Sequence, residues 1–321
     1  MISAKDPAFT AALREAVRGE VREAEPLARY STYRIGGPAT ILFPAGTDDV
    51  CLALRLAGEH GLSWFALGLG SNLLLPDEGL DPLVIRVGRG LDQLEALPGS
   101  RWRAGAGLPQ PIAARRTAEA GCAGLHRFVG VPGTVGGGIY MNAGCHGGDW
   151  AAVVESVTVA EATGAVRVLA RSEIPFGYRR SGLDRAVVLD TVVGLEPADP
   201  AALRSEVAEL FRWRQEGTPF NQPCCGSVFK NPGGASSHRP GEGQTAGQLI
   251  EQAGIKGRRV GGAEISPQHA NYFVNLAGAS ARDVRELIAL ARAAVRERFG
   301  VSLETEVKIV RPDGSFEASH E

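Results

Sequence analysis

The sequence predicts an α+β protein built from more than one domain. Its 321 residues exceed what one ordinary hydrophobic core accommodates, so two or three domains are expected. Near the start, a strand over 39–43, a helix over 47–61 and a strand over 64–67 follow one another as a small β–α–β unit. From Pro82 onwards the pattern changes to short strands with few helices, which favours an α+β arrangement over one continuous α/β sheet.

Cap and turn signals bound the elements in the first two thirds of the chain. Asp6-Pro7 can begin a short N-terminal helix, because Asp is a good cap residue and Pro is tolerated in the first turn. After the β–α–β unit we predict, in order, strands over 84–87 and 102–104, a helix over 109–120, strands over 153–160, 166–170 and 186–193, and a helix over 199–217. The run 218–223 contains two prolines, so it ends the last helix and predicts a domain boundary.

The last third of the chain contains the clearest helix. Helices are predicted over 244–253 and 280–299, and the second begins with a capping box at Ser280 and carries one continuous apolar stripe. A strand over 301–310 follows, in which apolar and polar residues alternate. Its polar side is formed by Glu304, Glu306 and Lys308. The tail after Pro312 is polar, and we expect it to fray.

Composition and charge exclude several classes of protein. With 44% apolar and 22% charged residues, the chain is typical of a globular protein. A net charge of −2 provides no basic surface for nucleic acid or for an anionic membrane. The N-terminus lacks a signal-peptide pattern, and no apolar run approaches the roughly 20 residues that span a bilayer. The five cysteines have no metal-ligand spacing, so we expect reduced thiols, no metal and a cytoplasmic location.

Two glycine-rich loops are the strongest candidates for a ligand site. The longer loop, 128–144, contains six glycines, and the shorter loop, 68–72, contains two. Glycine lets a ligand approach bare backbone, and successive amide N–H groups form a concave site for an anion such as phosphate. Two such loops indicate an extended ligand with a pyrophosphate, such as a dinucleotide. For either loop alone, a simple tight turn remains an alternative.

Three polar groups could carry chemistry. Ser227, in the run 225–232, is either a donor at a strand edge or a turn serine. The two arginines of the run 178–181 either serve a ligand or are simply solvated. Glu306 either faces a cleft or belongs to a polar outer face, and periodicity does not choose between these.

Taken together, these segments resemble the UDP-N-acetylenolpyruvoylglucosamine reductases, the MurB family of peptidoglycan synthesis. The matching segments are Ser31–Gly37, Gly68–Leu74, Gly130–Gly137, Met141–Gly144, Tyr178–Ser181, Gly226–Pro232, Ala246–Gly254 and Leu303–Val307. The resemblance implies a two-part FAD-binding domain of the vanillyl-alcohol oxidase (PCMH-type) kind over 1–217, with parts at about 20–75 and 76–217. It also implies a C-terminal α+β substrate-binding domain over 218–321, and the compact run 246–275 is similar to the second type of the family.

The family resemblance implies a flavin-dependent oxidoreductase with non-covalent FAD. NADPH reduces the flavin and leaves, and the flavin N5 then gives a hydride to UDP-N-acetylglucosamine enolpyruvate, producing the cell-wall precursor UDP-N-acetylmuramate. By the same resemblance we expect a small-molecule substrate, no nucleic-acid or membrane partner and a monomer.

The resemblance also assigns roles to individual residues. Ser227 would protonate the carbanion left by hydride addition, and the permanently charged Arg179 would polarise the substrate carboxylate into an enediolate-like form. Glu306 would lie near that carboxylate and, with Arg179, stabilise the enediolate. Like-charge repulsion there raises the pKa of Glu306 or makes it share a proton. Tyr178 and Asn231 would contact substrate, and Lys230 would meet a phosphate. FAD would be held by Tyr33, Arg34, Gly68, Gly70, Ser71, Asn72, Leu73, Pro132, Gly133, Thr134, Gly136, Gly137, Asn142, Ala143 and Gly144.

Two features depart from the family pattern, and two other functions compete with it. Cys145-His146 replaces the small-plus-aromatic pair often found there, and 236–243 resembles an inserted polar loop. A covalent flavin link or a nucleophile pair at Cys145-His146 is disfavoured, because adjacent side chains rarely point at each other. The competing functions are a related flavin oxidase that uses O2 and a nucleotide-binding module without catalysis. The joint presence of Arg179, Ser227 and Glu306 argues against both.

Overall fold

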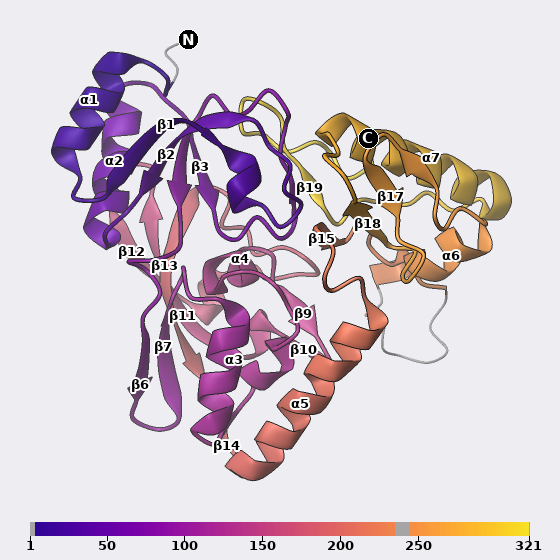
Figure 1. The fold of residues 1–321 in the computed structure, drawn as a ribbon. Helices are drawn as coiled ribbons and strands as arrows, with labels where there is room; N and C mark the ends of the chain where they lie inside the picture. Colours follow the sequence, from indigo (N-terminus) through magenta and orange to yellow (C-terminus); the bar gives the residue numbers. More distant parts are fainter. Residues whose placement is uncertain (1–3, 235–243, 321) are drawn as a thin grey trace. The chain divides into compact units, whose positions relative to one another are not determined.

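The computed structural model describes residues 4–234 and 244–320, which divide into two compact units (Figure 1). The first unit contains the described residues of Met1–Glu25, Ala39–Leu69 and Asp81–Arg212. The second contains those of Pro26–Pro38, Gly70–Leu80 and Trp213–Glu321. Each unit has a hydrophobic core of its own.

The N-terminal part of the first unit is a four-stranded sheet with two helices. Its strands lie in the order β1-β2-β5-β3, and β5 pairs in parallel with β2 and with β3. The elements are α1 (Pro7–Ala16), β1 (Glu20–Pro26), β2 (Pro38–Phe43), α2 (Thr47–Glu59), β3 (Trp64–Leu67) and β5 (Leu83–Arg86). Asp6 caps α1 with its carboxylate, and α1 packs against α2. The predicted elements are confirmed here, whereas the polar strand β1 was not predicted, since it lacks apolar alternation.

The second part of the first unit is a five-stranded antiparallel sheet in the order β12-β11-β13-β7-β6. Its strands are β6 (Leu94–Leu97), β7 (Arg101–Gly105), β11 (Val154–Glu161), β12 (Val166–Ala170) and β13 (Ala186–Gly194). The other elements are α3 (Gln110–Glu119), α4 (Val135–Tyr140), the short paired strands β8 (Cys122–Ala123) with β14 (Glu196–Pro197), and β9 (Gly144–Cys145) with β10 (Gly148–Asp149). α4 packs on β7 and β13, which places the longer glycine-rich loop against this sheet (Figure 1).

The second unit is a four-stranded antiparallel sheet in the order β15-β18-β17-β16, with α7 packed on β16 and β17 and also against α6 (Figure 1). α5 (Pro200–Gly217) precedes it and contains the boundary between the units. The elements are β15 (Cys224–Ser227), α6 (Ala246–Gln252), β16 (Arg259–Val260), β17 (Ala263–Ile265), β18 (Tyr272–Asn275), α7 (Ala281–Phe299) and β19 (Lys308–Ile309), which pairs in parallel with β4 (Leu73–Leu74). The predicted capping box of Ser280 on α7 is confirmed.

Two early segments, 26–38 and 70–80, are built into the second unit. The Asp77 carboxylate accepts a hydrogen bond of 2.8 Å from the Ala281 N–H at the start of α7. The Asn275 amide donates to the Tyr33 carbonyl at 2.9 Å. The compact units therefore do not follow the predicted boundary at residue 217, because these two segments belong to the second unit. The division into an FAD-binding and a substrate-binding domain stays a prediction.

The C-terminal prediction was wrong in two respects. Within 301–310 only β19 is a strand. The backbone of residues 304–306 forms hydrogen bonds with Val228, Lys230 and Ser319 instead of a regular ladder. Burial still alternates as expected, with Leu303, Thr305, Val307 and Ile309 buried. The tail that was expected to fray is folded: the Glu317 N–H donates to the Ile309 carbonyl at 2.9 Å. The polar loop at 236–243 lies outside the described residues.

Candidate active site

The longer glycine-rich loop contains a short helix that was not predicted. Thr134 caps α4 by accepting a hydrogen bond of 3.3 Å from the Gly137 N–H. The Gly136 N–H donates to the Ala106 carbonyl at 2.8 Å, so these two glycines have their amides committed to the protein. A Cβ on Gly136 would lie 2.9 Å from the Ala106 Cβ, and one on Gly138 would lie 2.4 Å from the Trp150 Nε1. Part of the glycine content therefore serves close packing rather than ligand access.

The two glycine-rich loops meet in the first unit. A Cβ on Gly68 would lie only 2.7 Å from the Thr134 Oγ1, so this position has no room for a side chain. Among the described residues, the backbone N–H groups of Gly68, Leu69, Gly133 and Thr134 donate to no protein acceptor. Uncommitted amides on two adjoining loops fit the anionic phosphates of a dinucleotide such as FAD.

The remainder of the shorter loop belongs to the second unit. Gly70 has a φ of +61°, and a Cβ there would lie 2.7 Å from the Tyr30 carbonyl oxygen, so both conformation and space require glycine. Arg34 is also left-handed, with a φ of +57°. Tyr33 is fully buried in the core of the second unit, and burial, with the Cys225 and Cys224 thiols nearby, raises its pKa.

Arg179 lies at the tip of a tight two-residue turn. Gly177 and Arg180 exchange backbone hydrogen bonds of 3.0 and 3.2 Å, which leaves Tyr178 and Arg179 between them. Arg179 has a φ of +56°, a conformation that costs a non-glycine residue roughly 1–2 kcal/mol. Its guanidinium lies 5.0 Å from the centre of the Tyr178 ring, which is 41% exposed. Strain of this kind gathers at functional sites, where the surrounding structure must hold it in place.

The end of the longer loop is tied to neighbouring backbone. Asn142 is buried, and its side chain bonds to Asp149, Ala151 and the carbonyl of Gly177. Ala143 donates its N–H to the Gly138 carbonyl at 2.8 Å. Gly144 pairs with Asp149 in the β9–β10 ladder. The loop thus ends in a rigid segment next to the Arg179 turn.

Ser227 and Glu306 are brought together in the second unit. Ser227 is the last residue of β15, an edge strand, so of the two alternatives considered it has the position at a strand edge. The carbonyl of the next residue, Val228, accepts hydrogen bonds from the N–H groups of Glu306 at 2.8 Å and Val307 at 3.3 Å. Asn72 of the shorter glycine loop donates its side-chain amide to the Glu306 carbonyl at 3.2 Å.

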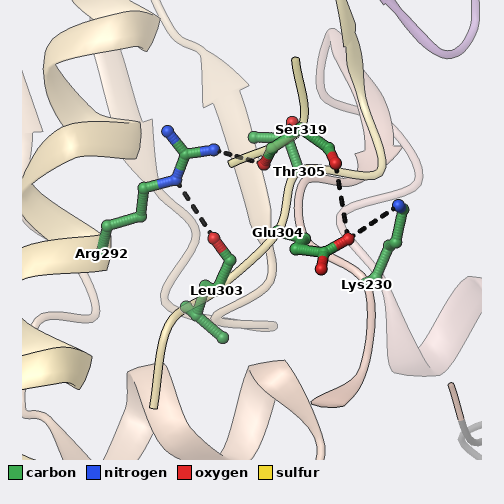
Figure 2. Close-up of polar contacts among 6 residues, drawn as sticks. All are labelled: Lys230, Arg292, Leu303, Glu304, Thr305 and Ser319. Atoms are coloured by element: carbon green, nitrogen blue, oxygen red, sulfur yellow. Dashed lines mark hydrogen bonds and ion pairs between the residues drawn. The ribbon is translucent and has the colours of Figure 1, made fainter. Parts of the chain in front are cut away.

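A polar cluster contacts residues 303–305, which directly precede Glu306 (Figure 2). The guanidinium of Arg292, on α7, donates to the carbonyls of Leu303 at 3.2 Å and Ser319 at 2.6 Å. The Ser319 carbonyl also accepts a hydrogen bond of 2.8 Å from the Thr305 N–H. Burial lowers the pKa of Arg292, but the two carbonyls give its charge polar partners. The folded tail and α7 therefore fix the segment that carries Glu306.

Lys230 and Asn231 also have protein partners. The Lys230 ammonium donates to the Glu304 carboxylate at 3.0 Å, and this hydrogen bond lowers the pKa of Glu304 (Figure 2). The Asn231 side-chain oxygen accepts a hydrogen bond of 3.1 Å from the Ala246 N–H at the start of α6. A phosphate at Lys230 would have to share that ammonium with Glu304.

The predicted residues fall into two sets, one in each unit. The first unit holds Gly68, Pro132, Gly133, Thr134, Gly136, Gly137, Asn142, Ala143, Gly144, Tyr178 and Arg179. The second holds Tyr33, Arg34, Gly70, Ser71, Asn72, Leu73, Ser227, Lys230, Asn231 and Glu306. Sequence reasoning missed Arg292 and Ser319, since an arginine on a helix and a serine in a polar tail carry no distinguishing signal.

Metal and membrane features are absent from the part of the chain that the structure describes. No group of three or more His, Cys, Asp or Glu side chains there is arranged to hold a metal ion. In the same residues, no helix combines the length and apolarity required to cross a bilayer.

Known proteins resemble both units. Residues 38–170 match the FAD binding domain, and 218–310 match the C-terminal domain of UDP-N-acetylenolpyruvoylglucosamine reductase. UDP-N-acetylenolpyruvoylglucosamine reductase 2 of Symbiobacterium thermophilum is 45% identical over 92% of this chain and 95% of its own, and the Caulobacter vibrioides reductase is 40% identical over 91% and 95%. The MurB crystal structure from Thermus caldophilus matches with a TM-score of 0.76 at 33% identity, covering 91% of this chain and 99% of its own. The chain therefore belongs to the UDP-N-acetylenolpyruvoylglucosamine reductase family, with the α+β fold and the FAD-binding domain expected of it.

Proposed function

We propose that this chain uses NADPH to reduce UDP-N-acetylglucosamine enolpyruvate to UDP-N-acetylmuramate, a precursor of peptidoglycan. Membership of the reductase family and the match of 38–170 to an FAD binding domain support this activity. Bound FAD would supply the redox chemistry, taking a hydride from NADPH and passing it to the enol-ether double bond.

The backbone of the first unit would hold the cofactor. The uncommitted N–H groups of Gly68, Leu69, Gly133 and Thr134 suit phosphate oxygens, because each amide donates a hydrogen bond without adding a side chain. Gly136 and Gly137 would act indirectly, since their amides already bond within the protein.

Arg179 would polarise the substrate carboxylate. Hydride addition to one alkene carbon leaves negative charge on the other, and the neighbouring carboxylate can take up that charge if a cation stabilises it. A guanidinium keeps its charge throughout and can bond both carboxylate oxygens at once. The strained backbone of Arg179 supports this role, because such strain persists where a side chain must be aimed.

Ser227 would protonate the carbon that carries this charge, with Glu306 beside it. The observation that carries this proposal is the bonding of the Glu306 N–H to the Val228 carbonyl at 2.8 Å, directly after Ser227. A serine hydroxyl is a weak acid, but a carbanion is a strong enough base to accept its proton. Glu306, whose backbone is bonded next to Ser227, would take part in resupplying that proton.

The experiment is an absorption spectrum followed by stopped-flow kinetics. The purified protein should be yellow, NADPH should bleach the flavin band, and anaerobic addition of the enolpyruvyl substrate should restore it within one turnover. A colourless protein that takes up no FAD would contradict the proposal. Reoxidation by air but not by the substrate would favour an oxidase instead.

A further inference from the structure

The turn that carries Arg179 is fastened on both sides to the C-terminal end of α4. The Asn142 side-chain amide donates to the Gly177 carbonyl at 3.1 Å. The Ser181 hydroxyl donates to the Tyr140 carbonyl at 2.8 Å. Gly177 and Ser181 flank the turn, and the residues they contact lie at the end of α4 in the same unit.

The side chain of Asn142 is committed to this scaffold. Its two amide hydrogens go to the Gly177 carbonyl and to the Asp149 carboxylate at 3.2 Å, and its oxygen accepts a hydrogen bond of 2.9 Å from the Ala151 N–H. A primary amide has only two donors, so none is left for a cofactor. The residue is 4% exposed with a φ of +41°, a conformation that Asn tolerates better than most residues.

We infer that Asn142 and Ser181 are positioning residues that hold Arg179 in register with the glycine-rich loop. The inference rests on the proposed function, in which Arg179 polarises the substrate carboxylate. A left-handed arginine relaxes to an ordinary conformation unless its neighbours prevent it. Two bonds on opposite sides of the turn prevent that relaxation. They connect the turn to the C-terminal end of α4, whose N-terminus is capped by Thr134 of the loop.

Loss of either bond to the Arg179 turn should slow reoxidation, because the Arg179 guanidinium would be displaced. A displacement of about 1 Å in a positioning group can slow a reaction by roughly 100-fold. Ser181→Ala removes one bond, that to the Tyr140 carbonyl, without changing a residue of the glycine-rich loop, so we expect reoxidation by substrate to slow by about 10-fold. Asn142→Gly removes the bond to Gly177, together with those to Asp149 and Ala151, while keeping a residue that accepts a positive φ. We expect a loss of up to about 100-fold.

A double-mutant cycle with Arg179→Ala tests whether Ser181 and Asn142 affect reoxidation through Arg179 or through a general loss of stability. If the two residues act through Arg179, adding Ser181→Ala or Asn142→Gly to Arg179→Ala should slow reoxidation no further. Reduction by NADPH and the FAD dissociation constant should stay within about 2-fold of wild type for Ser181→Ala. Amide hydrogen exchange in the 176–182 peptide should accelerate in both variants, a readout that does not depend on turnover.

Tyr140→Phe is the matched control. It removes the 2.8 Å bond from the Tyr140 hydroxyl to Asp184 at the same end of α4, yet leaves the Tyr140 carbonyl that Ser181 uses. Wild-type reoxidation in this variant, with slow reoxidation in Ser181→Ala, would support the inference.

The kinetics of the single and double variants distinguish a failure of the Arg179 role from a failure of the positioning role. Normal reoxidation in Arg179→Ala would overturn the proposed role of Arg179. Slow reoxidation in Arg179→Ala with wild-type kinetics in Ser181→Ala would overturn the positioning role and leave Arg179 intact. Additive losses in the double variants would also overturn it. If Asn142→Gly fails to fold or to retain FAD, the Ser181→Ala cycle decides the question alone.

Discussion

The two units present their predicted site residues in different ways. The first unit offers mostly backbone: adjoining glycine-rich loops with uncommitted amides, and one arginine on a strained turn. The second unit offers side chains, with Ser227 at the end of an edge strand and Glu306 bonded through its backbone to the next residue. The backbone of the first unit therefore suits phosphate binding, and the Ser227 side chain of the second unit suits proton delivery. A substitution at Gly68 should act on FAD binding, and one at Ser227 should act on reoxidation by substrate.

The largest effect is expected from Ser227→Ala. General acid catalysis contributes about 100- to 10,000-fold, so reoxidation of the reduced protein by the enolpyruvyl substrate should slow by that factor. Flavin reduction by NADPH should stay near normal, because no proton from serine is required there. Stopped-flow absorbance of each half-reaction measures both. Ser302→Ala, an exposed serine of the same unit, is the control and should behave as wild type. Equal losses in both half-reactions would contradict the assignment.

Gly68→Ala should weaken FAD binding instead. The new methyl group would lie 2.7 Å from the Thr134 Oγ1, which cannot move freely because it also caps α4. Forcing the loops apart should raise the FAD dissociation constant by about 5- to 150-fold, the range that 1–3 kcal/mol of overpacking produces. Titration of the apoprotein with FAD, followed by fluorescence, tests this. Gly46→Ala is the control, since nothing lies within 4 Å of that position. Unchanged affinity in Gly68→Ala would show that the loops do not hold the cofactor.

Arg292→Met tests the support of Glu306. The substitution removes two hydrogen bonds from a charged donor and leaves the buried Leu303 with an unpaired carbonyl (Figure 2). We expect the free energy of unfolding to fall by about 1–3 kcal/mol and turnover by about 10-fold, while FAD affinity is unchanged. Urea denaturation and steady-state kinetics measure these quantities. Arg296→Met, at an exposed position on the same helix, should alter neither. Loss of turnover without loss of stability would indicate that Arg292 acts on substrate directly.

The smallest effect concerns pH and His269. Burial, and then the nearby Arg214, lower the pKa of this residue from 6.5, and its Nδ1 accepts a hydrogen bond from the Asn271 N–H. On acidification the unfolded chain therefore binds a proton first, so stability is present above pH 6.5 and is lost as the pH falls through the lower folded-state pKa. The melting temperature should fall less steeply below pH 6.5 in His269→Gln than in wild type. A wild-type slope in His269→Gln would contradict the prediction.

Elements set by interactions between residues close in sequence were predicted correctly, and those set by partners distant in sequence were not. α7 was predicted to its ends, because its capping box, apolar stripe and terminal glycine are all local signals. The segment 301–307 was predicted as a strand from its alternation, and that alternation does describe its burial. Its hydrogen bonds instead go to residues 228–230 and to Ser319, which no local pattern indicates.

The candidate site shows the same division. Sequence pattern and family resemblance identified the glycine-rich loops, Arg179, Ser227 and Glu306 without coordinates. They did not show that Gly68 packs against Thr134 or that Arg179 has a positive φ. Nor did they show that both amide hydrogens of Asn142 bond within the protein.

The sequence alone determined which chemical groups are available to the candidate site. Residue type decides which side chains can donate a hydrogen bond, polarise a carboxylate or deliver a proton. The assignment of segments 26–38 and 70–80 to the second unit, and the fastening of the Arg179 turn to α4, were decided by tertiary structure. These features depend on hydrogen bonds between residues far apart in the sequence, such as the bond between Asp77 and Ala281. Such bonds exist only after the chain has folded, because local propensity carries no information about a partner 204 positions away.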